Sequence, residues 1–240
     1  MPDYAELEQA SLDQLATNDQ DWLAYLTLGE ALMRREEFKG AARAFASAAE
    51  IQPSSARAWG SMGKVLCYLG NFDGAQEYVD KGSALDSSEP SVLIGLGLIA
   101  YKAANLKGAR RFFERASIAN PLDVDAWFHL GQIYWEIGDM RRCADAFARS
   151  LQLDPGNMVA LRTMGNAYVA QKKFEEALAA YQQAAVIDPE IETTFYGIGT
   201  LLVKLGRDDE ALEAFEKALK IDPNYGEAWE AIAEVRNRKV

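Results

Sequence analysis

The sequence predicts an all-α solenoid in which antiparallel helix pairs stack side by side. The first observation is a glycine that recurs at a constant 34-residue step, at Gly29, Gly63, Gly97, Gly131, Gly165 and Gly199. The second is that three further registers keep the same step. One is small (Ala41, Ala75, Ala109, Cys143, Ala177, Ala211), one is mostly aromatic (Phe45, Val79, Phe113, Phe147, Tyr181, Phe215), and one is mostly proline (Pro53, Pro121, Pro155, Pro189, Pro223). The third is that apolar residues within each unit recur at spacings of three and four residues, which is typical of amphipathic helices.

Six repeats account for residues 22–225. They begin at Trp22, Ala56, Pro90, Val124, Met158 and Glu192, and a seventh begins at Gly226. In the fourth repeat Trp127, Leu130 and Tyr134 form one helical stripe. Gly138 interrupts this stripe before a second one starts. Because a single helix pair cannot bury both of its stripes, we expect neighbouring pairs to stack.

Polar residues mark the expected helix starts. Asp123, Asn157 and Ser88 each precede a new apolar stripe, and their side chains can cap a first helical turn. Pro90 falls in the first turn of its helix, where no backbone N–H donor is needed. We therefore expect short turns between the helices.

The glycine register predicts close packing inside each helix pair. A glycine within a helix costs about 1 kcal/mol relative to alanine. Six glycines at the same position therefore indicate that a side chain there would clash with the second helix. We expect the small register to form the opposing surface.

Both ends of the chain are expected to be capping helices. Residues 1–21 contain a helix over 3–17 whose leucines would cover the first repeat. Residues 226–240 form another, with Trp229 and Ile232 in core positions and charged residues on its other face. An end helix that is apolar inward and charged outward is typical of a repeat array.

Composition excludes several classes of function. Lys and Arg number 25 against 36 Asp and Glu, a formal net charge of −11, which disfavours nucleic-acid binding. No apolar run reaches the roughly 18 residues of a membrane span, so we expect no direct membrane insertion. Two cysteines and one histidine are too few for a zinc site, and His129 lacks a nucleophile and an orienting group. We expect no enzymatic activity, no cofactor and a reducing, cytoplasmic location.

The order of residues in one repeat resembles the tetratricopeptide repeat (TPR) family, whose repeats share this 34-residue period. The fourth repeat carries that order as Trp127, Leu130-Gly131, Tyr134, Phe147 and Pro155. The resemblance implies a right-handed superhelix over residues 22–225. It also implies a non-enzymatic scaffold or adaptor that holds a peptide or helix of another protein in a concave groove lined by the first helices.

The resemblance assigns the groove to five positions of each first helix. We expect a ligand to contact those over the middle of the array: Arg57, Lys64, Tyr68, Ile94, Leu98, Tyr101, Lys102, Phe128, Gln132, Trp135, Arg162, Asn166 and Tyr196. Their rings can anchor an apolar segment. Six cations and three anions occupy the groove positions, so we expect a partner with some acidic character, its carboxylates near Arg57, Lys64 and Lys102. The alternative is that the rings pack between repeats and the cations only solubilise the surface.

The sequence is also compatible with different roles. The protein could be an escort chaperone for a subunit of a secretion, envelope or membrane complex, and its end helices could mediate self-association. A basic ridge on the outer wall could bind an acidic partner, or be a solvated face paired with Glu114, Asp139 and Asp145; it comprises Arg110, Arg111, Arg115, Arg141, Arg142 and Arg149. A carboxylate clamp of the kind the family uses for chaperone tails is incomplete, because Gly197 follows the opening pair Arg162 and Asn166.

Overall fold

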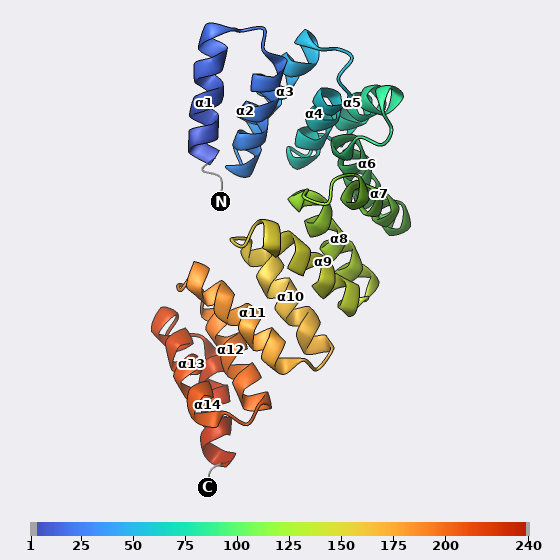
Figure 1. The fold of residues 1–240 in the computed structure, drawn as a ribbon. Coiled ribbons are helices and arrows are strands. Elements are labelled where there is room, and N and C mark those ends of the chain that lie inside the picture. The colour runs from blue at the N-terminus through green and yellow to red at the C-terminus, as the bar shows by residue number, and fades with distance from the viewer. Residues whose placement is uncertain (1–3, 239–240) are drawn as a thin grey trace. The chain divides into compact units, whose positions relative to one another are not determined.

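The computed structural model describes residues 4–238, which contain fourteen helices and no strand (Figure 1). The helices are α1 Tyr4–Thr17, α2 Trp22–Arg34, α3 Phe38–Ile51, α4 Ala56–Tyr68, α5 Phe72–Leu85, α6 Pro90–Lys102, α7 Leu106–Ala119, α8 Val124–Ile137, α9 Met140–Leu153, α10 Met158–Ala170, α11 Phe174–Ile187, α12 Glu192–Lys204, α13 Asp208–Ile221 and α14 Gly226–Arg238. The expected all-α architecture of helix pairs is confirmed.

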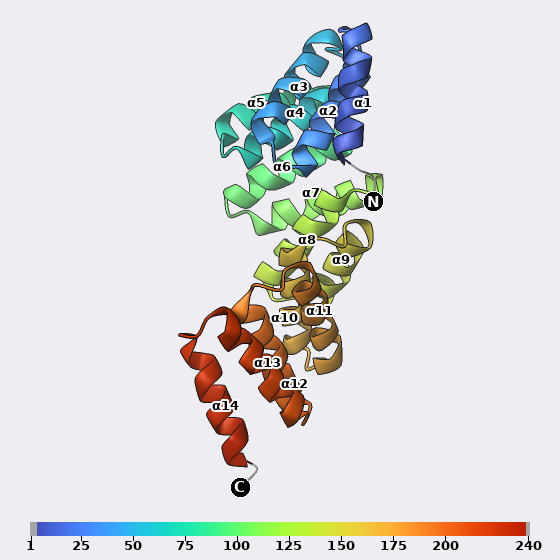
Figure 2. The same ribbon diagram turned by 90° about the vertical axis from the view of Figure 1, so that its left-hand side faces the viewer.

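The chain forms two compact units, Met1–His129 (unit 1) and Leu130–Val240 (unit 2), with the boundary inside α8. In unit 1 the pairs α2–α3, α4–α5 and α6–α7 stack in chain order, and α1 packs on α2. In unit 2 the pairs α10–α11 and α12–α13 do the same, with α9 against α10 and α14 against α13 (Figure 2). No helix within residues 4–238 has the length and hydropathy needed to cross a bilayer.

The 34-residue period predicted the start of every first helix correctly, from Trp22 to Gly226. Two of the three expected caps are confirmed. Asp123 Oδ1 accepts the backbone N–H of Ala126 at 3.0 Å, and Asn157 Oδ1 accepts that of Ala160 at 2.9 Å.

The prediction that Ser88 caps α6 was wrong. Its hydroxyl instead donates to Asp86 Oδ1 at 2.6 Å, so it is already engaged in the preceding turn. Glu89 occupies the cap position of α6, but its side chain accepts no hydrogen bond from a backbone N–H of the first turn. Pro90 is the first residue of α6, as expected.

Each glycine of the 34-residue register lies against the second helix of its own pair, but the opposing residue differs from the expectation. A Cβ on Gly97 would lie 2.6 Å from the ring of Phe113, and one on Gly165 would lie 2.8 Å from the ring of Tyr181. The glycines therefore make room for the aromatic register rather than for the small register. The small register is nonetheless fully buried in all six repeats. Which register faces the glycine depends on how each helix is rotated about its axis. The residue spacing within one helix does not determine that rotation.

The end helices differ in how well they fit the expectation. Ile232 of α14 is buried as expected, whereas Trp229 is 56% exposed. Trp229 was expected in the core, and this expectation was wrong. In the complete repeats a second helix covers the same register position, and no helix of residues 4–238 follows α14. Ser11 of α1 is buried within unit 1, while Leu7 stays 38% exposed.

One buried hydroxyl in unit 2 lacks a partner, and its removal should stabilise the protein. The Thr194 Oγ1 is fully buried and has no hydrogen-bond partner in the structure. An unsatisfied buried hydroxyl costs about 1–3 kcal/mol. We expect Thr194→Val, which keeps the shape of the side chain, to raise the free energy of unfolding by about 1 kcal/mol in urea denaturation. Thr200→Val is the control, because the Thr200 hydroxyl donates to the Tyr196 carbonyl; equal effects of the two changes would contradict the explanation.

Candidate functional site

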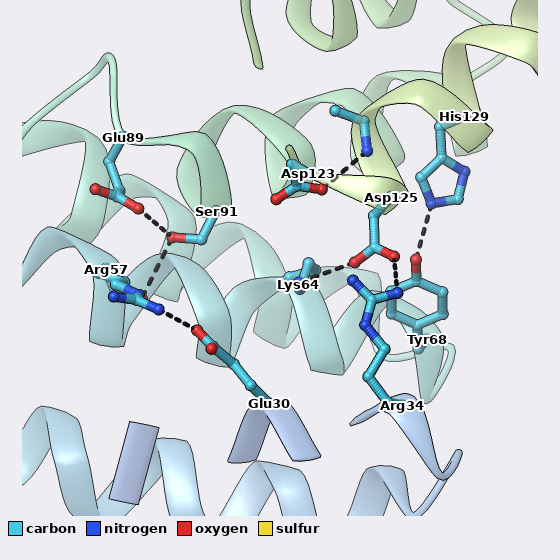
Figure 3. Close-up of polar contacts among 11 residues, drawn as sticks. Glu30, Arg34, Arg57, Lys64, Tyr68, Glu89, Ser91, Asp123, Asp125 and His129 are labelled. Atoms are coloured by element: carbon cyan, nitrogen blue, oxygen red, sulfur yellow. Dashed lines mark hydrogen bonds and ion pairs between the residues drawn. The ribbon is translucent and has the colours of Figure 1, made fainter. Parts of the chain in front are cut away.

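A buried ion cluster joins the first helices of unit 1. We call it the Asp125 cluster, and it consists of Arg34, Lys64 and Asp125, from α2, α4 and α8 (Figure 3). Lys64 Nζ donates to Asp125 Oδ2 at 3.0 Å, and Arg34 Nη1 donates to Asp125 Oδ1 at 3.1 Å. The side chains of Lys64 and Asp125 are only 12% and 15% exposed. One carboxylate therefore ties together three repeats.

The electrostatics of the Asp125 cluster favour the charged forms. Burial opposes ionisation of Asp125, but the Lys64 ammonium and the Arg34 guanidinium outweigh it and hold its pKa well below the ordinary value. Burial also opposes the charge of Lys64, yet Asp125 raises the Lys64 pKa. The neighbouring Asp123 behaves differently, because burial and repulsion from Asp125 raise its pKa. The cluster is therefore locked as one carboxylate between two cations.

A second polar contact lies beside this cluster. The hydroxyl of Tyr68 and Nε2 of His129 are 2.8 Å apart, and the His129 ring stacks on Phe113 with centroids 5.0 Å apart. Burial raises the pKa of Tyr68 well above its usual value. His129 itself is buried. Tyr68, an expected ligand contact, thus uses its hydroxyl inside unit 1.

Two of the three cations expected to meet a partner's carboxylates, Arg57 and Lys64, are paired within the chain, whereas Lys102 has no carboxylate partner within residues 4–238. Lys64 pairs with Asp125, and Arg57 Nη2 donates to Glu30 Oε1 at 2.5 Å (Figure 3). Ser91 Oγ also donates to the backbone carbonyl of Arg57 at 3.3 Å. The difference arises because first helices of unit 1, both adjacent ones such as α2 and α4 and non-adjacent ones such as α4 and α8, approach within side-chain reach. The 34-residue spacing carries no information on that distance.

The remaining predicted residues of unit 1 divide between core and surface. Ile94 is fully buried, so it belongs to the core and offers nothing to a ligand. Leu98 is half-buried and Tyr101 is exposed. Lys102 is exposed, with its ammonium 5.4 Å from the ring centroid of Phe72. Phe128 is half-buried and meets the His129 ring edge-on, with centroids 5.5 Å apart.

Unit 2 presents a different first-helix surface, which we call the α10 face: Val159, Arg162 and Asn166. These side chains lie on one side of α10, because they are three and four residues apart. Val159 and Asn166 are exposed and Arg162 is half-buried. Asn166 Oδ1 accepts a hydrogen bond from the hydroxyl of Tyr181 at 2.8 Å. No carboxylate within residues 4–238 pairs with Arg162, in contrast to Arg34, Arg57 and Lys64.

Three more predicted residues of unit 2 lie on neighbouring first helices. Trp135, in the part of α8 that belongs to unit 2, is 37% exposed, and Gln132 is half-buried. Tyr196 of α12 is half-buried and packs edge-on against Tyr225, with centroids 5.4 Å apart. Part of each ring is therefore accessible at first-helix positions.

The cysteines are both buried free thiols. Cys143 lies in the small register as expected, and Cys67 lies on α4. Burial raises the pKa of each thiol to about 12. Both are therefore poor nucleophiles, because the thiolate is the reactive form.

The basic ridge carries the three ion pairs that were anticipated for a solvated face. Arg110 lies 3.5 Å from Glu114 in unit 1, and in unit 2 Arg141 lies 3.9 Å from Asp145 and Arg142 2.6 Å from Asp139. The other arginines have local contacts: Arg111 lies over the Phe112 ring, Arg115 donates to the Ser87 carbonyl, and Arg149 donates to Gln152. These contacts favour the solvated-face interpretation.

The helix pairs, their 34-residue register and their close glycine contacts define an all-α helical-repeat protein. Family profiles agree: those described as tetratricopeptide repeat match residues 61–117, 94–157 and 193–225, and one described as TPR repeat matches residues 165–206. Together these matches cover more than half of the chain. The chain belongs to the tetratricopeptide-repeat family. No curated protein matches it in sequence.

Solved structures share the fold. YrrB, described as a TPR protein with an unusual peptide-binding site, is 24% identical with a TM-score of 0.66, over 79% of this chain and 98% of its own. PilF of Pseudomonas aeruginosa is 22% identical with a TM-score of 0.68, over 90% of this chain and 98% of its own. One chain in the structure of the APC/C hetero-tetramer Cut9–Hcn1 is 17% identical with a TM-score of 0.67, and the match covers 97% of this chain and 46% of that chain. At these identities the likeness establishes the fold.

Proposed function

We propose that this protein is a non-enzymatic scaffold that binds an extended or helical segment of a partner protein on the α10 face. The observation that carries the proposal is Arg162, a half-buried arginine that forms no ion pair with any carboxylate of residues 4–238. Of the other five groove cations, Arg34, Lys64 and Arg57 have such a partner, while Lys102 and Lys204 lie over the rings of Phe72 and Phe174. A carboxylate on the bound segment would supply the missing one.

The chemistry of the α10 face suits an acidic segment with apolar anchors. Because Tyr181 engages the carbonyl oxygen of Asn166, the amide group of Asn166 stays available as a donor. Arg162 and Asn166, one turn apart, can then donate to the same carboxylate, and charge-assisted bonds of this kind are short and strong. Val159 adds exposed apolar surface beside them. The accessible parts of Trp135 and Tyr196 are ring surfaces of the kind that dominate binding hot spots.

The comparisons support a protein partner in general terms. YrrB is described as having a peptide-binding site, and Cut9 is described in an assembly with Hcn1. Both are properties of those proteins. They make a partner protein the natural class of ligand for this chain, while the acidic character of the segment rests on Arg162 alone.

Reversal of the charge at Arg162 should abolish selection for acidic peptides. We expect Arg162→Glu to weaken binding of Asp- and Glu-containing peptides from an immobilised library about 10-fold or more, since hydrogen bonds to charged groups contribute about 1.5–3 kcal/mol. Arg149→Glu is the matched control, because Arg149 lies on a second helix of the same unit and bonds only to Gln152. Fluorescence anisotropy with the strongest peptide gives the affinities.

Two results would contradict the proposal. Equal binding of acidic peptides and their Lys-substituted versions would remove the role of Arg162. Absence of peptide binding, together with a partner subunit that stays soluble only on co-expression, would favour the escort-chaperone alternative. In that case the protein would shield an apolar surface rather than select a charged segment.

A further inference from the structure

The two end helices have the bounds of two different halves of a repeat. Moving α3 back by one 34-residue period gives Tyr4–Thr17, the bounds of α1, so α1 has the register of a second helix. Moving α12 forward by one 34-residue period gives Gly226–Arg238, the bounds of α14, so α14 has the register of a first helix. The described chain thus carries both halves of one further helix pair, one at each end.

Both end helices expose positions that the complete repeats cover. Leu7 stands at the register position of the small residues, which are fully buried in all six repeats, yet Leu7 is 38% exposed. Trp229 stands at the register position of Trp59 and Trp127, which are half-buried, yet it is 56% exposed. The Trp229 indole is already held as in those repeats, because its Nε1 donates to the Pro223 carbonyl at 3.0 Å. The corresponding bonds are Trp59 to Pro53 and Trp127 to Pro121.

Three register pairs match between the end helices in size or charge. In the complete repeats the glycine at the eighth position faces the large residue at the twenty-fourth, as Gly97 faces Phe113. In the end helices these positions hold Ala233, which is larger than the glycine of the complete repeats, and Ser11, which is smaller than the residue that faces that glycine. The fourth and twenty-third positions, which stack as Trp59 on Tyr78 in the second repeat, are Trp229 and Ala10 in the end helices. Trp127 and Ala146 are the same residue types at these positions in the fourth repeat.

The third pair supplies complementary charge. The eleventh and nineteenth positions are neighbours in the complete repeats: Arg142 lies over the Tyr134 ring at 4.9 Å, and a Cβ on Gly40 would lie 3.2 Å from Leu32. In the end helices these positions are Arg236 and Glu6, and Arg236 is 62% exposed and lies 3.4 Å from Glu216 of α13. The acidic residues of α14, which are Glu227, Glu230 and Glu234, stand at the second, fifth and ninth positions, on a different side of the helix.

We propose that this protein associates head to tail, with α14 of one molecule packing on α1 of a second copy to complete a seventh helix pair. The contact is heterologous, since it joins two different surfaces. In a pair of molecules it leaves one α1 and one α14 available to bind further copies. Self-repulsion from the net charge of −11 is screened at about 0.15 M salt, where the Debye length is about 8 Å. The contact is independent of the α10 face, so its failure would leave the proposed function standing.

Charge reversal on each end separates this contact from any other mode of association. We expect the weight-average mass of the wild-type chain in sedimentation equilibrium to rise above 26.5 kDa with concentration. Glu6→Lys and Arg236→Glu should each weaken association about 10-fold, because each places like charges at the junction. An equimolar mixture of the two variants should recover wild-type association, since a junction between unlike chains again joins opposite charges.

A further variant, a control variant and two contradicting results complete this test. Trp229→Glu should weaken association about 30-fold, as expected for a hot-spot ring. Val186→Glu, which changes an 84% exposed side chain on α11 away from both ends, should have no effect. A wild-type chain that stays monomeric at close to millimolar concentration would overturn the proposal. So would association that survives in Glu6→Lys alone, because that result indicates a symmetric contact of α14 with itself.

Discussion

Replacement of Gly60 by alanine is expected to lower the free energy of unfolding by about 3 kcal/mol, the upper part of the range for overpacked cores. A Cβ at this position would lie 2.6 Å from the backbone nitrogen of Val92, on the neighbouring first helix α6. A backbone atom cannot rotate away as a side chain can. The only relief is a separation of α4 from α6, which would loosen the packing of both. Urea denaturation followed by circular dichroism measures the loss.

Gly226→Ala is the matched control for this change. Gly226 is the first residue of α14, and a Cβ there would meet nothing within 4 Å. We expect its unfolding free energy to stay within about 0.5 kcal/mol of the wild type, as for a surface change. Similar losses for the two variants would show that helix propensity, and not the contact between α4 and α6, decides the outcome at Gly60.

Removal of the charge of Asp125 should also cost about 3 kcal/mol of unfolding free energy. Asp125→Asn keeps the shape of the side chain but leaves Lys64, 12% exposed, without its carboxylate. An unpaired buried charge costs about 3–5 kcal/mol. The double variant Lys64→Met/Asp125→Asn should regain much of the loss, since it removes the stranded cation. The control is Glu77→Gln, which breaks the exposed pair with Lys81 and should leave the free energy of unfolding almost unchanged.

The pH dependence provides an independent check on Asp125. Its pKa is held below the ordinary value in the folded protein, despite the opposing effect of burial, by Lys64 and Arg34. The stabilisation is therefore complete above the pKa of the unfolded chain, about 3.9, and disappears as pH falls through the lower folded value. The stability difference between wild type and Asp125→Asn should shrink below about pH 4. A difference that stays constant down to about pH 2 would contradict the ion pairing.

Local features of this fold could be predicted from the sequence, while contacts between helices could not. The helix starts were correct because the period, the caps and the turns are properties of short stretches of chain. The glycine positions were correct, but their aromatic partners were not, because the rotation of each helix was unknown. The pairing of Lys64 with Asp125 requires the distance between non-adjacent repeats, which no spacing in the sequence encodes. The prediction that Ser88 caps a helix was wrong for a simpler reason, because its hydroxyl donates a hydrogen bond to Asp86 instead.

The site was predicted with similar limits. First-helix positions were correctly expected to carry charged and aromatic side chains, but charge alone could not show which cations are neutralised. The structure separates Arg162, which has no carboxylate partner within residues 4–238, from Arg57 and Lys64, which have one. Opposite charges at groove positions of different repeats, as at Glu30 and Arg57, were the available signal for this pairing.

The bond between Arg34 and Asp125 joins the first and fourth repeats, 91 residues apart in the sequence. Repeat arrays are ordinarily described by nearest-neighbour energies, so that their ends fray while the middle stays folded. This ion pair spans two intervening repeats and does not fit that description, because α2 cannot separate without breaking the bond between Arg34 and Asp125 of α8. Unit 1 should therefore melt as one cooperative block, with amide hydrogen exchange in α2 as slow as that in α4.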